Sequence, residues 1–238
     1  MAVFSTILSL GLLASAAVDA SPIEKRAVIG HDAVVGFPET VPSGTVGAVY
    51  KAYQPFLKVV NGCVPFPAVD ASGNTGGGLS PSGSSNGGCS SSTGQIYTRG
   101  TTYGNYYAVM YSWYFPKDSP STGLGHRHDW EGVIVWLSSS TSTSASNIVS
   151  VCPSAHGGWD CSAGYSLYGT GPLVKYESVW PVNHACELTN VVGGQQPLIA
   201  WESLPAVAQS ALSSTDFGAA NVPFKNGNFL DNLAKATF

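Results

Sequence analysis

Hydrophobic residues along the chain fall mostly into short runs separated by glycine, proline, serine and asparagine. The two most apolar runs, residues 106–115 and 132–137, are rich in β-branched and aromatic side chains. Short runs of this kind, bounded by turn residues, are typical of strands buried on both faces, so we expect both at the centre of a sheet. We expect further strands at residues 95–99, 147–152, 174–180 and 198–201.

A smaller part of the chain has helical spacing. Residues 43–57 place apolar side chains on one helical face, with Ser43 as the predicted N-cap and Pro55 as a late breaker. Two shorter helices are expected at residues 205–212, which begin with proline, and at residues 228–236. Many strands and few helices predict a mainly β fold, an antiparallel β-sandwich flanked by a few helices.

The beginning of the sequence has the features of a secretory leader. Residues 4–17 are apolar but too few to span a bilayer, and residues 18–20 have the small-x-small form of a cleavage site. We therefore predict a signal peptide over residues 1–20 and a secreted protein that is not membrane-spanning. Residues 21–26 end in Lys25-Arg26, a dibasic pair of the kind that secretory proteases cut, which predicts a propeptide and one mature domain over residues 27–238. In the alternative interpretation this pair is an ordinary exposed tail.

Five cysteines follow the predicted leader, and an oxidising compartment favours their pairing. Cys63 and Cys89 bracket a Gly/Ser-rich segment that cannot order itself by burying apolar surface, so we expect a disulfide between them. Cys152 and Cys161 flank a short loop and are the pair that we expect among the other three, although spacing leaves the connectivity open. Cys186 would then be a free thiol.

Charge is scarce: 44% of the residues are hydrophobic and 10% are charged, where about 25% charged is ordinary for a soluble protein. This composition excludes disorder. The formal net charge of −4 argues against binding to nucleic acid and against simple electrostatic adsorption to anionic lipid.

The few charges gather in one place. Five of the 20 charged residues after position 26 lie within residues 117–131, between the two most apolar runs, and two histidines lie there as well. Asp118, Asp129 and Glu131 offer hard oxygen ligands and His126 a nitrogen, which favours an open site for Mg²⁺, Ca²⁺ or Mn²⁺ over structural zinc. In the alternative interpretation these groups form ion pairs and hydrogen bonds that tie a loop to the sheet.

The alternation of side chains along a strand predicts which face His126, Arg127 and His128 occupy. If a strand begins at Asp129, Asp129 and Glu131 face one side, and His126 joins them only if it is still in the preceding turn. His128 then faces the other side, as a donor behind the ligands or as a core histidine. Arg127 shares the side of the carboxylates, and we expect it to pair with one of them.

The heptapeptide GHRHDWE, from Gly125 to Glu131, closely resembles the signature of the necrosis- and ethylene-inducing peptide-like proteins. The likeness extends to the motifs HDAVV, VVNGCVPFPAVD, QQPLIAWE and STDFGAANVPF in the rest of the chain. The resemblance implies a secreted microbial cytolysin with a β-sandwich similar to actinoporins and fungal lectins. It also implies binding to glycosyl inositol phosphorylceramide sphingolipids of plant plasma membranes, followed by leakage and necrosis.

The resemblance also implies roles for individual residues. In the family, the positions that match Asp118, His126, Asp129 and Glu131 hold Mg²⁺ or Ca²⁺, which takes part in recognising the sugar headgroup. Asp70 and Asn74 match positions near the same cavity. Trp159 lies in a segment that would border the membrane-facing rim, and we expect it to be an exposed loop aromatic that enters the membrane interface. The pair matching Cys63 and Cys89 is common in the family, whereas the other three cysteines are additional.

Three further roles stay open at this point. The segment from Ala108 to Gly132 is expected to be sensed by a plant pattern-recognition receptor. In a second alternative, the chain is a non-cytotoxic homologue that acts as an elicitor or as a lectin-like binder. In a third alternative it is a metal-dependent hydrolase with Glu131 or His128 as general base, whereas our main expectation is that it is not an enzyme.

Overall fold

The computed structural model describes residues 26–178 and 183–238. The predicted signal peptide, Lys25 and the last two residues of the strand predicted at 174–180 lie outside these ranges. Among the described helices, none has the length and apolar character needed to cross a membrane.

The largest sheet has six strands in the order β12-β4-β5-β6-β7-β8. Its centre is formed by β5 (Tyr106–Asp118) and β6 (His126–Leu137), which confirms the predicted place of the two most apolar runs. Both strands are longer than predicted, because their polar ends continue the antiparallel pairing as far as Asp118 and His126. The outer strands are β4 (Ile96–Tyr103), β7 (Ile148–Ala155), β8 (Gly158–Trp159) and β12 (Leu198–Ala200).

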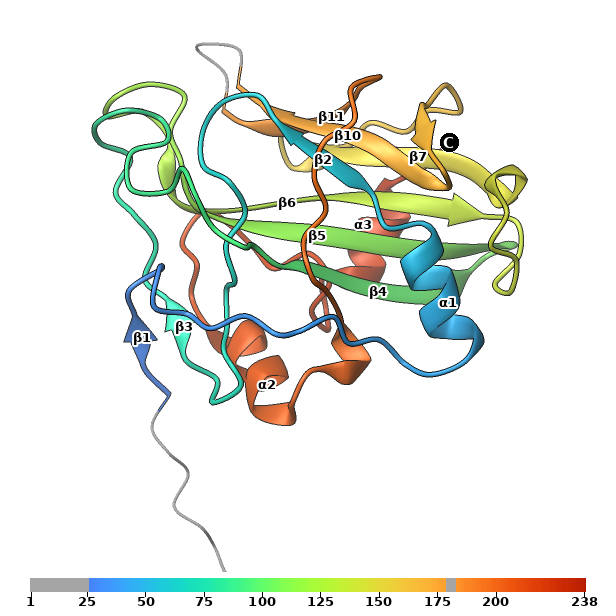
Figure 1. Cartoon of the computed structure of the whole chain (residues 1–238), viewed down its shortest axis with the longest axis horizontal. Coiled ribbons are helices and arrows are strands. Elements are labelled where there is room, and N and C mark those ends of the chain that lie inside the picture. The colour runs from blue at the N-terminus through green and yellow to red at the C-terminus, as the bar shows by residue number, and fades with distance from the viewer. Residues whose placement is uncertain (1–25, 179–182) are drawn as a thin grey trace, which may run out of the picture.

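A second sheet lies across one face of the first (Figure 1). It contains β2 (Phe56–Val59), β10 (Gly171–Glu177) and β11 (Ala185–Leu188), with β9 (Leu167–Tyr168) paired to β10. The rings of Phe115 and Tyr176 stack 3.8 Å apart between the two sheets. The predicted mainly β sandwich is therefore confirmed, although β10 pairs with β2, and β12 with β4, in parallel.

The C-terminal segment covers the opposite face of the large sheet. Trp130 of β6 contacts the rings of Phe217 and Phe224, and Trp136 contacts that of Phe238. This segment includes α2 (Ala206–Ser214) and α3 (Phe229–Lys235), close to the two short helices predicted from the sequence. A 3₁₀ turn, η2 (Trp201–Ser203), precedes them, and another, η1 (Ala145–Asn147), leads into β7.

The helix predicted at residues 43–57 is shorter in the structure. Helix α1 covers Thr45–Ala52, and Gly44 rather than Ser43 occupies the N-cap. Pro55 prevents continuation of the helix. Leu57 instead lies in β2, where it is buried, so the apolar spacing at the end of the predicted helix belongs to a strand.

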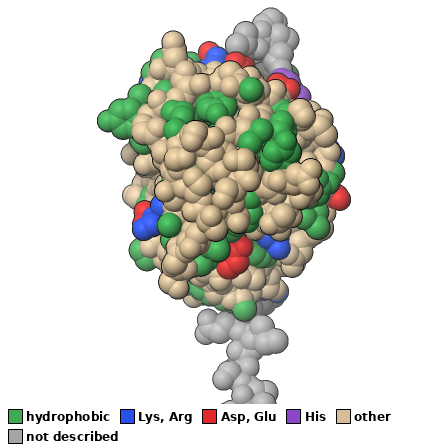
Figure 2. Space-filling model, turned by 90° about the vertical axis from the view of Figure 1, so that its right-hand side faces the viewer, with side chains coloured by type: hydrophobic (Ala, Val, Ile, Leu, Met, Phe, Trp, Pro, Cys, Tyr) green, Lys and Arg blue, Asp and Glu red, His purple; other side chains and the backbone are tan. Residues whose placement is uncertain are grey.

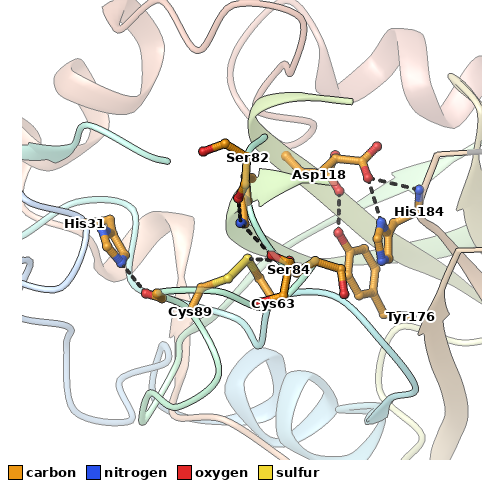
Figure 3. Close-up of a disulfide and its surroundings, with 12 residues drawn as sticks. His31, Cys63, Ser82, Ser84, Cys89, Asp118, Tyr176 and His184 are labelled. Atoms are coloured by element: carbon orange, nitrogen blue, oxygen red, sulfur yellow. Dashed lines mark hydrogen bonds and ion pairs between the residues drawn. A yellow bond between two sulfur atoms is a disulfide. The ribbon is translucent and has the colours of Figure 1, made fainter. Parts of the chain in front are cut away.

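Both predicted disulfides are present, Cys63–Cys89 and Cys152–Cys161, and Cys186 is a buried free thiol. The first closes the Gly/Ser-rich loop beside the end of β5 (Figure 3). The short strands β1 (Val28–Ile29) and β3 (Thr75–Gly76) pair in parallel at the left side of the molecule in Figure 1. A side view shows mainly uncharged side chains on one face, with isolated charges (Figure 2).

Candidate functional site

A cavity of about 660 Å³ lies between the end of the large sheet, the hairpin of β7 and β8, and helix α3. Its acidic wall is made by Asp118 at the end of β5 and by Asp129 and Glu131 of β6. The remaining walls include His126, Ser154, His156, Trp159, Asn183, His184, Asn221, Asn228, Asp231, Asn232 and Lys235. The four residues predicted as metal ligands therefore line one cavity.

Strand β6 presents His126 and Asp129 to the same cavity because its backbone is irregular between them. His128 has φ 60°, in the left-handed region that non-glycine residues rarely adopt, and this breaks the alternation of side chains. The prediction that His126 must lie in the preceding turn was therefore wrong, since it begins the strand. Gly125, just before it, has φ 96°, and a Cβ there would lie 2.3 Å from the carbonyl oxygen of Asp118.

The three carboxylates of the cavity are buried: the exposed fractions are 1% for Asp118, 5% for Asp129 and 9% for Glu131. Burial, followed by the nearby charge of Asp118, raises the pKa of Asp129 to about 7. Burial and the nearby charge of Asp129 raise the pKa of Glu131 well above its ordinary value. Asp129 and Glu131 are therefore costly to ionise at this site.

Hydrogen bonds hold each carboxylate in place. The hydroxyl of Tyr176 donates to Oδ2 of Asp129 at 2.8 Å, and the hydroxyl of Ser154 donates to Oε2 of Glu131. Asp118 accepts at Oδ1 from Nδ1 of His184 at 2.6 Å (Figure 3). The other oxygen of Asp118, Oδ2, is buried and has no hydrogen-bond partner among the described residues. It is therefore free to accept a ligand from the cavity.

His126 is oriented toward this unpartnered oxygen. Its Nδ1 donates a hydrogen bond to the carbonyl oxygen of His128 at 2.7 Å, which fixes the tautomer of the neutral ring. In that tautomer Nε2 carries the lone pair, and it lies 3.6 Å from Oδ2 of Asp118. A histidine held in this way by its other nitrogen has the arrangement typical of a metal ligand.

The two basic side chains of the charged segment do not neutralise the carboxylates. Lys117 donates to the carbonyl oxygens of Ser82 and Ser84, at 3.1 and 3.0 Å, and burial lowers its pKa. Arg127 donates to the carbonyl oxygens of Gly77 and Gly78, so the expected ion pair between Arg127 and a carboxylate was wrong. Within the described ranges, no lysine or arginine forms an ion pair with the three cavity carboxylates.

The donor set fits a hard divalent cation. Three buried carboxylates, an unpartnered oxygen and an imidazole with a fixed tautomer are ligands that suit Mg²⁺ or Ca²⁺. Within the described ranges, no group of three or more His, Cys, Asp or Glu side chains is placed so that it could hold a metal ion as it stands. By residue type, Asp118, His126, Asp129 and Glu131 are the side chains that would hold such an ion, with water molecules completing its coordination, as Mg²⁺ commonly requires.

Two residues that were predicted to line the cavity, His128 and Arg127, point away from it. His128 is buried among aromatic rings, with Nδ1 2.6 Å from the hydroxyl of Tyr114 and its ring edge-on to Phe217. It does not line the cavity, and the proposal that it acts there as a general base was wrong. Burial and the charge of Arg127 lower the pKa of His128 to about 4, so it is neutral at neutral pH. Arg127 likewise points to the loop of Gly77 and not into the cavity.

Asp70 and Asn74 also lie outside the cavity lining. Asp70 accepts hydrogen bonds from the backbone nitrogens of Ser72 and Asn74, each at 2.9 Å, and so closes a tight turn before β3. This local preference of aspartate for the backbone that follows it explains the placement. Trp159 does line the cavity, but as a half-buried residue of β8 whose indole nitrogen donates to Asn232 at 3.3 Å. The prediction that Trp159 is an exposed loop aromatic was wrong.

Several cavity residues had not been predicted. His184 contacts Asp118 from a segment 66 positions further along the chain, and α3 contributes Asn232 and Lys235. Neither segment has polar residues at a regular spacing that would point to a site. The alternation of side chains along β6 predicts that Asp129 and Glu131 face one side, but the residues across the cavity are placed by the packing of distant elements.

The sequence and fold have known relatives. A family model described as necrosis inducing protein (NPP1) matches residues 47–236. The necrosis-inducing protein NPP1 of Phytophthora nicotianae is 47% identical over 235 residues, which cover 96% of this chain and 98% of the relative. NLP effector protein 10 of Phytophthora capsici is 46% identical over 220 residues, covering 90% and 93% respectively.

Solved structures have the same fold. NLPPya in complex with mannosamine is 52% identical, with a TM-score of 0.84, and covers 89% of this chain and 100% of its own. The complex of NLPPya with glucosamine is 51% identical, with the same coverage and a TM-score of 0.83. A protein described as non-toxic HaNLP3 is 39% identical, with a TM-score of 0.82 and coverages of 87% and 98%.

Proposed function

Because this chain belongs to the NPP1 family of necrosis-inducing proteins, we propose that it is a secreted toxin that binds sugar headgroups at the plant plasma membrane. The headgroups are those of glycosyl inositol phosphorylceramide sphingolipids. Binding uses a divalent cation in the acidic cavity and leads to membrane leakage, necrosis and immune elicitation. The observation that carries this proposal is the group of three buried carboxylates, with an unpartnered oxygen on Asp118.

The acidic wall is suited to hold Mg²⁺ or Ca²⁺, and such an ion supplies a Lewis acid that coordinates sugar hydroxyls. The residues of the chain do the positioning. Tyr176 and Ser154 fix the carboxylates of Asp129 and Glu131, and His184 fixes that of Asp118. Because these groups are already oriented, little side-chain entropy is lost on binding.

The other walls of the cavity are suited to a sugar. Asn228 and Asn232 lie in these walls, and Trp159 presents part of an indole ring. The amide NH₂ groups of both asparagines donate to backbone carbonyl oxygens, and the indole nitrogen donates to Asn232. The groups left for a sugar are therefore the amide oxygen of Asn228, which can accept from a hydroxyl, and the apolar face of the indole. The complexes of NLPPya with mannosamine and glucosamine support a sugar as the ligand.

Vesicle leakage tests this function. The protein is added to vesicles with and without plant sphingolipid, each with and without a chelator of divalent cations. We expect leakage only with sphingolipid and free cation, and its loss in Asp118→Asn. Asp160→Asn is the matched control, because Asp160 is an exposed carboxylate outside the cavity lining. Equal leakage in all four conditions would contradict the proposal.

The non-cytotoxic alternative is supported by one relative, HaNLP3, which has the same fold and is described as non-toxic. Leaf infiltration with wild type and Asp118→Asn separates the two roles. Necrosis that is lost in the variant while immune signalling persists would show both a toxin and an elicitor. Immune signalling without necrosis from the wild type would favour the elicitor alone.

We propose that the cavity binds and does not catalyse. The alternative of a metal-dependent hydrolase retains Glu131 as general base, since Glu131 lines the cavity. Incubation with the sphingolipid, followed by mass spectrometry of the lipid, distinguishes the two. A cleaved headgroup that requires Glu131 would favour the hydrolase.

A further inference from the structure

The backbone nitrogen of Ala27 donates a hydrogen bond to the side chain of Asn74, which is in turn hydrogen-bonded to the carboxylate of Asp70. Ala27 donates to Oδ1 of Asn74 at 3.0 Å, and Nδ2 of Asn74 donates to Oδ2 of Asp70 at 2.9 Å. A carboxylate only accepts, so Asp70 fixes which way the amide of Asn74 points. The amide oxygen therefore faces the nitrogen of Ala27, and the amide NH₂ faces the negative charge.

This arrangement is built into a rigid turn. Both backbone groups of Ala27 are engaged, because its carbonyl oxygen accepts from the nitrogen of Thr75 at 3.0 Å. Asp70 accepts from the backbone of Ser72 and Asn74 with its other oxygen. Gly73 has φ 80°, and a Cβ there would lie 3.2 Å from the Cδ of Arg26. The chain at Arg26 and Ala27 thus packs closely against the turn.

We propose that the bond between Arg26 and Ala27 is a proteolytic processing site, and that the turn of Asp70 and Asn74 binds the α-ammonium group that cleavage creates. The dibasic pair Lys25-Arg26 supplies the recognition sequence for a dibasic-specific endoprotease. Hydrolysis breaks the amide bond: the hydroxyl of water goes to the carbonyl carbon of Arg26, and its proton goes to the nitrogen of Ala27. At neutral pH the products are a carboxylate and an ammonium.

An ammonium at Ala27 fits this turn better than the uncleaved amide does. A charged donor makes a shorter and stronger hydrogen bond to Oδ1 of Asn74 than a neutral one. The dipole of the Asn74 amide is then stabilised at both ends, by the ammonium at its oxygen and by Asp70 at its NH₂. Ala27 is exposed, so water can accept hydrogen bonds from the other two N–H groups of the ammonium.

The residue before the bond is accessible. The side chain of Arg26 is exposed and donates to the hydroxyls of Ser210 and Ser214 on α2, at 3.0 and 3.3 Å. Cleavage removes this nearby positive charge together with the propeptide. The positive charge that remains near Asp70 is then the new terminus, which is linked to the Asp70 carboxylate by the hydrogen-bonded amide of Asn74.

The bound terminus also supports the edge of the candidate site. Val28 pairs with Thr75 in β1 and β3, and the nitrogen of Gly77 donates to the carbonyl oxygen of Ile29 at 2.7 Å. Arg127 of β6 in turn donates to the carbonyl oxygen of Gly77. Anchoring Ala27 therefore stabilises the segment on which the beginning of β6 rests.

Two forms of the protein test the ammonium site: one that begins at Ala27 with a free amine, and one extended by residues 21–26 with Arg26→Gln to prevent cleavage. We expect the free form to unfold about 2–4 °C higher. The difference is expected to vanish in Asp70→Asn and in Asn74→Ala. It is expected to persist in Asp32→Asn, which removes an exposed carboxylate near the same terminus. Equal unfolding temperatures of the free and the extended form, both with Asp70 and Asn74 unchanged, would overturn the ammonium site.

A chemical readout separates this effect from a general loss of stability. An amine-reactive reagent at neutral pH should label the α-amine of Ala27 roughly fivefold more slowly in the wild type than in Asp70→Asn. Equal rates would contradict the assignment even if the variants fold poorly. The cleavage itself is tested by secreting the full chain from a host with a dibasic-specific endoprotease. A mature N-terminus at any residue other than Ala27 would overturn the processing site.

Discussion

Oδ1 of Asp118 accepts two hydrogen bonds from His184, one from Nδ1 at 2.6 Å and one from the backbone nitrogen at 3.3 Å (Figure 3). The imidazole stacks on the ring of Tyr176, 4.7 Å between centroids, and its Nε2 faces Gly62. His184 is thus a fixed ring that occupies one oxygen of Asp118. The other oxygen remains for a ligand in the cavity.

Replacing this ring should weaken cation binding. In His184→Phe the stacking on Tyr176 is retained, but Asp118 loses its side-chain donor and keeps only the longer hydrogen bond from the backbone nitrogen. We expect the affinity for Mg²⁺ or Ca²⁺ to fall by roughly 10–100-fold, as is usual when the partner of a metal ligand is lost. Calorimetric titration measures this, and thermal unfolding checks that the variant is folded. An unchanged affinity in a folded variant would show that Asp118 needs no such positioning.

Gly62 should be intolerant of any side chain, because a Cβ at this position would lie 2.4 Å from Nε2 of His184. Gly62 also has φ 80°, which is costly for alanine. Gly83→Ala is the matched control, since Gly83 has φ 70° but open space around it. We expect Gly62→Ala to lower the free energy of unfolding by roughly 1–3 kcal/mol more than the control, measured in urea. Equal losses would show that the contact with His184 yields without cost.

The disulfide Cys152–Cys161 should stabilise the hairpin wall of the cavity. It joins β7 to the residues after β8, which carries Trp159. Replacing both cysteines with alanine should lower the free energy of unfolding by about 2–3 kcal/mol, from the entropy of a loop this short. Glucosamine affinity should fall as well. If stability falls and sugar affinity does not, Trp159 is held by Asn232 without help from the disulfide.

Acid should destabilise the protein through His128. The pKa of His128 is about 4 in the folded protein and about 6.5 when unperturbed, so the unfolded chain binds more protons between these values. The contribution of neutral His128 to stability is therefore complete above about 6.5 and is lost as the pH falls toward 4. His128→Gln should flatten this part of the stability curve, measured by urea unfolding across the pH range. The difference between the two curves isolates His128 from Asp129, whose raised pKa acts in the opposite direction.

Receptor sensing of the segment from Ala108 to Gly132 should require loss of the fold. Residues 108–118 of β5 are buried along their whole length, and β6 is buried from His128 onward. We expect protease-digested protein to trigger immune signalling at lower concentration than intact protein in plants. Resistance to digestion should delay the response. Equal potency of intact protein under conditions that prevent digestion would place the recognised residues on the folded surface.

The central strands and the acidic residues of β6 were predictable because they depend on local pattern. The two apolar runs are stable only where both faces of the strand are buried, which places them at the centre of the sheet. Because charge is scarce elsewhere in the chain, the charged segment at residues 117–131 is easy to recognise. The positive φ of His128, the turn around Asp70 and the direction of Arg127 depend on contacts with loop backbone. Those contacts have no signature in residue type or spacing. His184 shows the same limit, because a single histidine far along the chain gives no indication of its partner.

The cavity draws its walls from β5, β6, β8 and α3, and α3 ends at Lys235 in a chain of 238 residues. A ribosome delivers a chain from its N-terminus, so β5 and β6 are made before α3. The carboxylates of the acidic wall are therefore synthesised about a hundred residues before Asn228 and Asn232. The cavity is complete only after α3 has been made, so a chain terminated before α3 would carry the carboxylates without the opposite wall of the pocket.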